Sequence, residues 1–205
     1  RHCRWAVQQR HQENHLSNDQ GRQDPSASTL DDIARHFVEA RRAGRSLPDF
    51  PGAIPPDLVT AYQVQDLAIT RWGDAVAGWK IGYIAPERRD VSGDERLLGP
   101  VFARNLWIAT GSIVDIPVFS GAGGFAAVEA EYVLQLQADA PADKYDWTPE
   151  EAAALPTRLF IGVEVASSPL ATINVLGPKV VVSDFGNNNG LVLGAEIADW
   201  TRLDE

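Results

Sequence analysis

Two glutamates separated by a single residue are the first candidates for chemistry in this sequence. Residues 126–136 alternate between apolar and polar side chains as a β-strand does. Glu129 and Glu131 therefore fall on one face of the expected strand, where their like charges repel, more strongly if that face is buried. A hard divalent cation between them would turn the repulsion into binding, because carboxylate oxygens suit such ions. A solvated strand face is the alternative.

A third acid stands in an apolar segment later in the chain. Glu164 lies within residues 159–166, where it would share its strand face with apolar residues and glycine. A carboxylate in such a segment is seldom buried without a partner. Lysine and arginine are scarce nearby in the sequence, so a cation shared with Glu129 and Glu131 accounts for all three acids. We therefore predict a site for Mg²⁺ or Mn²⁺ on these three residues.

Lys80 is the candidate for proton transfer or charge stabilisation. The expected strand over residues 75–84 places Lys80 between Gly78 and Gly82 on one face. The missing side chains of the glycines leave room for a ligand beside the ammonium group. A lysine that extends into solvent from an edge strand is an equally good interpretation of the same spacing.

The last candidate for a functional site is a polar turn near the end of the chain. Residues 184–190 contain three asparagines and two glycines, which favour unusual backbone angles and supply hydrogen-bonding groups. Asp184 either caps its own turn or forms a polar wall of an active site. The second interpretation requires the fold to bring this turn next to Glu164.

The composition is that of a globular protein whose acidic half carries the candidate site. The 205 residues are 44% hydrophobic and 22% charged, with a net charge of −10, and their number suits one domain. Residues 105–205 hold 14 acidic and four basic residues. The charge argues against a nucleic-acid surface, and no apolar segment approaches the length of a membrane span. The single cysteine favours a reducing compartment, the cytoplasm.

The elements that must position these residues follow a polar N-terminal segment. Residues 1–28 show no sustained period, and we expect a disordered or extraneous tail. A helix that begins at Ser28 or Thr29 and a second over residues 56–72 come next. Three arginines near the end of the first helix complement its dipole.

Strands dominate the rest of the sequence. A polar loop or lid is expected at residues 85–96, and Thr148 predicts the cap of a short helix. The expected strands cover residues 75–84, 97–106, 113–118, 126–136, 159–166, 179–183 and 191–194. The sequence begins at Arg1, contains no methionine, and ends soon after the last of these strands. We expect a catalytic domain over residues 29–205 that is incomplete at its C-terminus.

The order of the motifs resembles the hydratase/decarboxylase branch of the fumarylacetoacetate hydrolase superfamily. The motifs are Ala61-Tyr-Gln-Val-Gln65, Gly78-Trp-Lys-Ile-Gly82, Val128-Glu-Ala-Glu131, the isolated Glu164, and Asp184 followed by Gly190-Leu-Val-Leu-Gly194. The resemblance covers roughly residues 29–200, and the ordered set is more specific than any single motif.

This resemblance implies a fold and a set of roles. The fold is α+β, with N-terminal helices packed on a mixed, barrel-like β-sheet like that of the fumarylacetoacetase C-terminal domain. The implied roles are metal ligands for Glu129, Glu131 and Glu164, catalysis for Lys80, and substrate binding for Asp184, Asn187 and Asn188. The resemblance also implies a homo-oligomer, or a complex with a related decarboxylase or aldolase.

The activity implied is the metal-dependent hydration of 2-hydroxypenta-2,4-dienoate to 4-hydroxy-2-oxopentanoate in aromatic meta-cleavage catabolism. The alternatives are a 4-oxalocrotonate-type decarboxylase and, third, a hydrolase of acylpyruvates or fumarylacetoacetate. An inactive fragment or a partner subunit is the non-enzymatic alternative. The missing acidic residue in residues 96–102 and the expected truncation at the C-terminus favour it, whereas Lys80 and the three glutamates oppose it. A second departure, the lack of an aspartate and an arginine in residues 164–169, bears on which reaction is catalysed.

Overall fold

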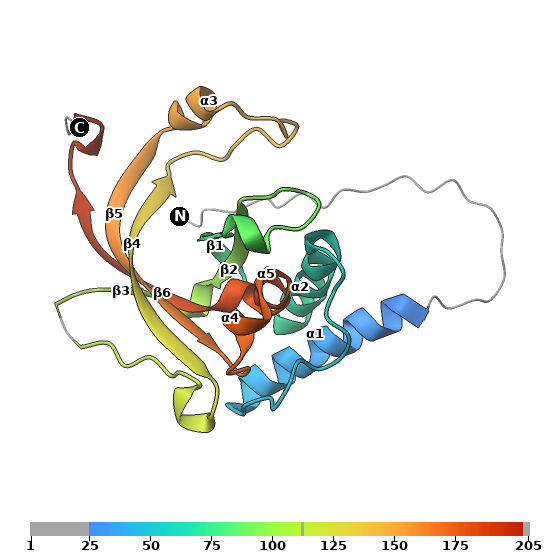
Figure 1. Cartoon of the computed structure of the whole chain (residues 1–205). Helices are drawn as coiled ribbons and strands as arrows, with labels where there is room; N and C mark the ends of the chain where they lie inside the picture. The colour runs from blue at the N-terminus through green and yellow to red at the C-terminus, as the bar shows by residue number, and fades with distance from the viewer. Residues whose placement is uncertain (1–24, 112, 203–205) are drawn as a thin grey trace.

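The protein folds into N-terminal helices, a β-hairpin and a curved sheet, in a computed structural model that describes residues 25–111 and 113–202 (Figure 1). The helices are α1 (Pro25–Ala43), α2 (Leu58–Trp72), α3 (Pro149–Ala153), α4 (Ile173–Leu176) and α5 (Pro178–Ser183). The strands are β1 (Val76–Tyr83), β2 (Arg96–Phe102), β3 (Leu106–Ile108), β4 (Phe125–Leu136), β5 (Thr157–Ser168) and β6 (Asn188–Ile197). Short 3₁₀ helices are η1 (Pro86–Arg88), η2 (Ala103–Asn105), η3 (Ser120–Ala122), η4 (Phe185–Asn187) and η5 (Trp200–Arg202). None of the described helices has the length and apolar character that crossing a membrane requires.

The two N-terminal helices form the main core with the segment that follows β5. α1 begins at Pro25, so the expected start at Ser28 or Thr29 is wrong, and the predicted tail lies outside the described residues except for residues 25–28. α2 follows its prediction closely: Asp57 caps it by accepting a hydrogen bond from the Thr60 amide, and Gly73 ends it in the left-handed region. The core cluster draws its buried side chains from α1, α2, β2, α4, α5 and the segments beside them.

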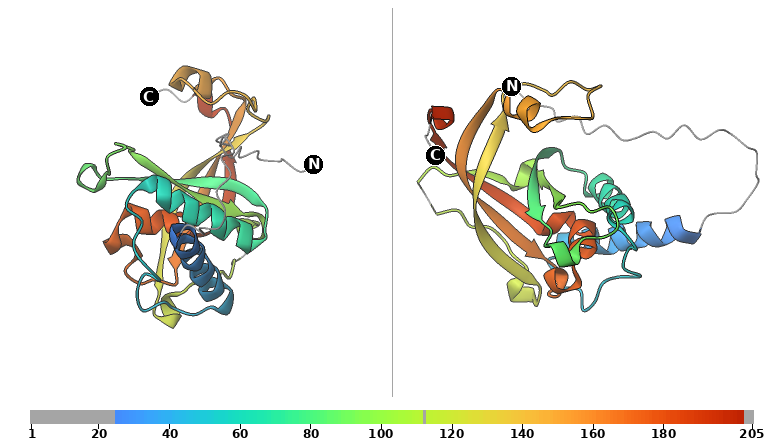
Figure 2. Two further views of the ribbon diagram at one scale, coloured as in Figure 1. Left: turned by 90° about the vertical axis from the view of Figure 1, so that its right-hand side faces the viewer. Right: turned by 45° about the horizontal axis from the view of Figure 1, so that its top comes forward.

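The strands form a hairpin and a mixed sheet. β1 and β2 pair antiparallel, and the four-stranded sheet has the order β3-β6-β5-β4 with only β3 and β6 parallel. The sheet curves around the hairpin, and the helices lie beyond the hairpin on the same side (Figures 1 and 2). The predicted α+β fold, with N-terminal helices on a mixed sheet, is confirmed. In the described residues the sheet is open.

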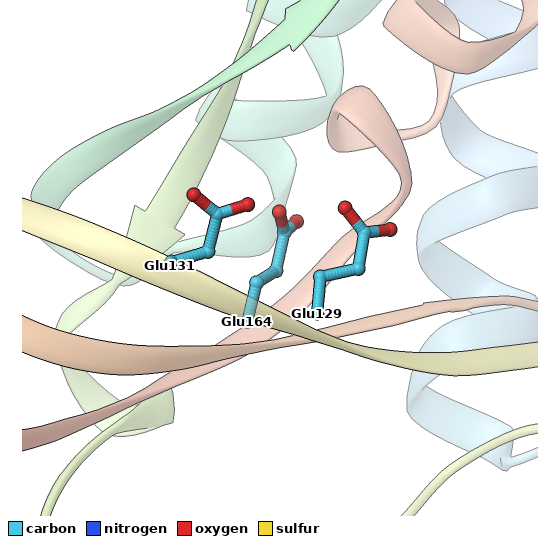
Figure 3. A group of neighbouring side chains, drawn as sticks. All are labelled: Glu129, Glu131 and Glu164. Carbon is cyan, nitrogen blue, oxygen red and sulfur yellow. The ribbon is translucent and has the colours of Figure 1, made fainter.

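β4 and β5 pair over their whole length and set the two faces of the sheet. Glu129 lies directly opposite Glu164 in this antiparallel register. The glutamates project from the concave face, which is turned toward the hairpin (Figures 1 and 3). Neighbouring residues point to the convex face, where Val128 and Tyr132 are 74% and 75% exposed. The alternation expected from the sequence is thus present in the structure.

Two predicted strands are absent. The segment Lys179–Ser183 is part of helix α5, which begins at Pro178 after Gly177. Its valines favour a strand locally, but proline at the first position favours a helical turn, and burial of Val180 and Val182 against the N-terminal helices decides the outcome. The second absent strand is residues 113–118, which lie in no strand of the structure.

The backbones of the hairpin and of η4 are in direct contact, because glycines stand at the point where they meet. Gly99 pairs with Lys80 in the hairpin, and a Cβ atom at Gly99 would lie 2.2 Å from the Phe185 carbonyl oxygen. Gly186, at φ 63°, would place its own Cβ 2.7 Å from the Gly99 Cα. Only glycine fits both positions, so the chain can bring Lys80 close to the start of β6.

Candidate metal centre

Three carboxylates meet on the concave face of the sheet. Glu129 and Glu131 come from β4 and Glu164 from β5, and each offers one oxygen that lies within 4.8 Å of the other two (Figure 3). Glu129 and Glu131 are exposed, whereas Glu164 is 3% exposed. The structure therefore brings together the three acids that the sequence singled out, and it does so through strand pairing.

Glu164 is the electrostatic centre of the group. Its Oε1 accepts a hydrogen bond of 3.0 Å from Asn188 Nδ2 and lies 3.4 Å from Lys80 Nζ. Burial raises the pKa of the Glu164 carboxyl, and Glu129 adds to this, while the charge of Lys80 and the bond from Asn188 oppose it. Additional positive charge beside Glu164 would stabilise the ionised form of its carboxyl group.

Lys80 points to the acids and not into solvent. Its side chain is 14% exposed and forms an ion pair with Glu164. The two flanking glycines differ in what they leave open: a Cβ at Gly78 would meet nothing within 4 Å, but one at Gly82 would lie 3.0 Å from Leu97 Cδ1. The expected free space beside Lys80 is thus on the Gly78 side. A pairing between Lys80 and Glu164 was not visible in the sequence because the two residues are far apart along the chain.

Asp184 does not join the acids. Its Oδ1 accepts a 2.6 Å bond from Arg41 Nε, and its Oδ2 accepts bonds from Arg41 Nη2 and Ser168 Oγ at 2.9 and 2.6 Å. Both side chains of the pair are nearly inaccessible, 4% for Arg41 and 0% for Asp184. The sequence offered only a helix-dipole explanation for Arg41, so this buried pair was missed. Asp184 stays a predicted substrate-binding residue, but its oxygens are engaged inside the protein.

The two asparagines of the turn have different surroundings. Asn188 is the first residue of β6 and contacts Glu164, so it belongs to the candidate centre. Asn187 is buried with its Nδ2 3.5 Å from Asn174 Oδ1, and its own Oδ1 has no hydrogen-bond partner among the residues that the structure describes. The turn thus supplies the centre through Asn188, while the predicted role of Asn187 stays a prediction.

Two of the three carboxylates, those of Glu131 and Glu164, line a cleft between the hairpin and the sheet. The cleft has a volume of about 210 Å³ and contains Lys80, Glu131, Glu164 and Asn188 among its walls. Its remaining walls are mostly apolar, and they include Ile81, Val101 and Leu191. The donor set consists of carboxylate oxygens, with an amide and an ammonium group beside them. That set fits a hard ion such as Mg²⁺ or Mn²⁺, and a cation held there would oppose the effect of burial, which raises the pKa of the Glu164 carboxyl.

Neutral replacements of two of the carboxylates test this centre. Glu129→Gln and Glu164→Gln should each weaken Mg²⁺ and Mn²⁺ binding, because an amide keeps the shape of the side chain and loses its charge. The double variant should lose binding measurable by titration calorimetry. Glu87→Gln, at an exposed position of η1, is the matched control and should bind as the parent does. Parental affinity in the double variant would show that these residues are not the metal site.

The fold is shared with solved structures of an enzyme. No family model and no curated protein matches this sequence. Structures of 4-oxalocrotonate decarboxylase from Pseudomonas putida G7 are similar, one complexed with magnesium and adipate and another with calcium and acetate. Their TM-scores are 0.58 and 0.56, with 19% sequence identity in both, over 82% of this chain and 62% of theirs. This chain therefore spans less than two thirds of their length, and what it shares with them is the α+β fold.

Proposed function

We propose that this chain carries the active site of a metal-dependent lyase that hydrates 2-hydroxypenta-2,4-dienoate to 4-hydroxy-2-oxopentanoate. The observation that supports it is the convergence of three carboxylates with the Lys80 ammonium group, at a cleft that Glu131, Glu164 and Lys80 line. The fold shared with a decarboxylase crystallised with magnesium supports metal-dependent chemistry on a 2-oxo acid. Perturbed, partly buried titratable groups in a cleft are typical of catalytic sites.

Each residue of the centre has a separate task in this proposal. Glu129, Glu131 and Glu164 hold Mg²⁺ or Mn²⁺, and Asn188 fixes the orientation of Glu164 through its hydrogen bond. When bound, the ion supplies positive charge that stabilises negative charge developing on the substrate oxygens. Lys80 Nζ stands beside Glu164 and donates to the substrate 2-oxygen or moves a proton there.

The reaction consumes one water and no other reactant. A proton is delivered to C5 of the dienol while the 2-hydroxyl loses its own, which gives the conjugated 2-oxo acid. Water then adds at C4, and a proton is delivered to C3. The apolar walls of the cleft lower the local dielectric and so strengthen the electrostatic effect of Lys80 on these steps.

Decarboxylation of a 4-oxalocrotonate-type diacid is the second candidate, because the similar structures are of such an enzyme. The arginines around the hairpin decide our order of preference. Arg88 donates to the Asn174 carbonyl, Arg89 binds Glu95, and Arg96 stacks on Tyr83. Each of these cations is engaged outside the cleft, so none is positioned there to receive a second carboxylate.

A hydrolase of acylpyruvates ranks third for a reason that the structure supplies. That reaction usually requires a histidine to activate water. Within the described residues the histidine is His36, on α1, where its Nδ1 lies 2.7 Å from the Asp32 carbonyl oxygen. It is outside the cleft of the three glutamates.

Parallel assays of the two lyase reactions test the proposal. With Mg²⁺ present, we expect ultraviolet absorbance to show hydration of 2-hydroxypenta-2,4-dienoate, and CO₂ trapping to show little decarboxylation of 4-oxalocrotonate. EDTA should abolish the hydration, whereas a binding-only or inactive protein would turn over neither substrate with or without metal. Decarboxylation faster than hydration would overturn the preferred reaction.

Assembly and location complete the proposal. We also propose that the protein is cytoplasmic and that it forms a homo-oligomer or a complex with a related decarboxylase or aldolase. The convex face of β4 and β5 exposes apolar side chains that a monomer seldom leaves in water, among them Val128 and Ile161. These side chains support assembly of this chain with a partner.

A further inference from the structure

A second cavity adjoins the cleft of the three glutamates. It has a volume of about 390 Å³ and is lined by residues of the hairpin, β3, β4 and β6. The two hollows share walls, which are Trp79, Val101, Val133, Leu134 and Leu191. We call this second cavity the apolar chamber. A molecule with one end at the glutamates can therefore extend its other end into the chamber.

The walls of the chamber carry no charge. Beyond the shared residues they consist of aliphatic side chains and a glycine, with Gln135 as the polar exception among the described residues. Leu136, at the end of β4, and Leu193, on β6, contribute to the chamber and not to the cleft. The polarity of the combined site therefore falls sharply from the glutamates toward the chamber.

The bases nearest to this hollow already have partners. Lys80 stands at the glutamate end and forms an ion pair with Glu164. Arg158 projects from the same face of β5 as Glu164 does, but it is not a chamber wall. Its guanidinium binds both oxygens of Glu196 and packs over the Phe160 ring at 4.9 Å. A carboxylate placed in the chamber would lose its hydration without gaining a cation.

We propose that the apolar chamber binds the uncharged tail of a 2-oxo acid whose carboxylate and 2-oxygen lie at the three glutamates. The inference rests on the proposed function and names the substrate class: monoacids with an apolar tail, and not dicarboxylates. The chamber volume falls within the range of about 300–1,000 Å³ that ligand pockets occupy. That is more than the terminal vinyl group of a pentadienoate fills, so longer tails are accepted.

Binding of three inert 2-oxo acids at saturating Mg²⁺ tests the chamber. 2-Oxobutanoate, 2-oxohexanoate and 2-oxoadipate share the chelating end and differ in the tail. Each methylene buried in the chamber should raise affinity about fourfold, so 2-oxohexanoate should bind about tenfold or more tighter than 2-oxobutanoate in titration calorimetry. It should bind tighter than 2-oxoadipate by at least about tenfold, because the second carboxylate of the diacid is buried without a partner.

Variants of one chamber residue separate its role from general effects on the fold. Leu193→Lys introduces a cation and should shift the preference toward 2-oxoadipate. Leu193→Phe fills the space without adding charge and should remove the gain from 2-oxobutanoate to 2-oxohexanoate. Val59→Lys is the matched control, since Val59 is 66% exposed on α2 and is a wall of neither hollow, and it should leave both preferences unchanged.

The outcomes distinguish this inference from the proposed function. If the parent binds 2-oxoadipate as tightly as 2-oxohexanoate, or if Leu193→Phe keeps the full dependence on tail length, the chamber assignment is wrong and the metal centre stands. If none of the three acids, nor oxalate, binds in a Mg²⁺-dependent manner, the proposed function is wrong, and the assignment of the chamber is overturned with it.

Discussion

Lys80→Met lowers the Mg²⁺-dependent hydration of 2-hydroxypenta-2,4-dienoate by about 10²-fold or more, the usual scale for a positioned acid–base group. This is the expected result because the Lys80 ammonium is the cation that the described residues place in the cleft, 3.4 Å from Glu164 Oε1. Methionine keeps the length and apolar stem of the side chain, so β1 should retain its pairing with β2. The loss should appear in kcat as well as in kcat/KM, since the charge acts on the reacting oxygen.

Lys80→Arg supplies the control for charge. Arginine keeps the positive charge and cannot release its proton, and its planar group spreads over more space than an ammonium. If Lys80 moves a proton, the arginine variant should lose nearly as much turnover as the methionine variant, whereas a purely electrostatic role would preserve much of it. Lys80→Met leaves the buried Glu164 without its cation, so both variants are compared with the parent at saturating Mg²⁺, where the bound ion compensates that carboxylate and thermal melting should stay near the parental value. Full activity of Lys80→Met would reduce Lys80 to a structural residue of the hairpin.

Arg41→Met should destabilise the folded protein by about 3–5 kcal/mol, the range for breaking a buried ion pair from one side. The reason is that Asp184 would remain in the core, 0% exposed, with Ser168 but without the guanidinium that binds both of its oxygens. Arg41 also donates to the Ser167 carbonyl oxygen, 3.0 Å away, so a second buried acceptor loses its partner. Guanidinium denaturation monitored by tryptophan fluorescence measures the change.

Two further variants show whether the pair itself is responsible. Arg45→Met replaces an exposed arginine of the same region and should change the free energy of unfolding by no more than about 0.5 kcal/mol. Adding Asp184→Asn to Arg41→Met removes the unpaired charge and should recover part of the lost stability. Equal effects of Arg41→Met and Arg45→Met would contradict the assignment, because the first residue is buried and the second is not.

The convergence of the three glutamates was predictable because strand geometry is local. Side chains alternate between the two faces of a strand, so Glu129 and Glu131 share a face whatever the rest of the fold is. Glu164 stands alone in an apolar strand, where a buried carboxylate requires a compensating partner. The helices α1 and α2 were recognisable for the same reason, since Asp57 and Gly73 are local signals for the ends of α2. The start of α1 at Pro25 was missed because the serines and threonine that follow look like caps.

What the sequence could not show depends on contacts between distant segments. The valines of α5 have strand propensity, and only packing against the N-terminal helices makes them helical. Asp184 in a polar turn resembles a surface residue until α1 brings Arg41 to it across 143 positions. The apolar chamber gave no signal either, because its walls come from the hairpin, β4 and β6 and meet only when the sheet curves.

Glu129 and Glu164 lie directly opposite each other, so an ion bound between them would affect how β4 and β5 align. Like charges facing each other across two strands disfavour the alignment that brings them together, and a slip by one residue would send one of them to the convex face. An ion that binds both carboxylates favours only the native alignment. Under the proposed function, thermodynamic linkage would make that alignment more stable by RT ln(1 + [ion]/Kd), so an ion bound for the chemistry would also select, by mass action, how β4 and β5 pair.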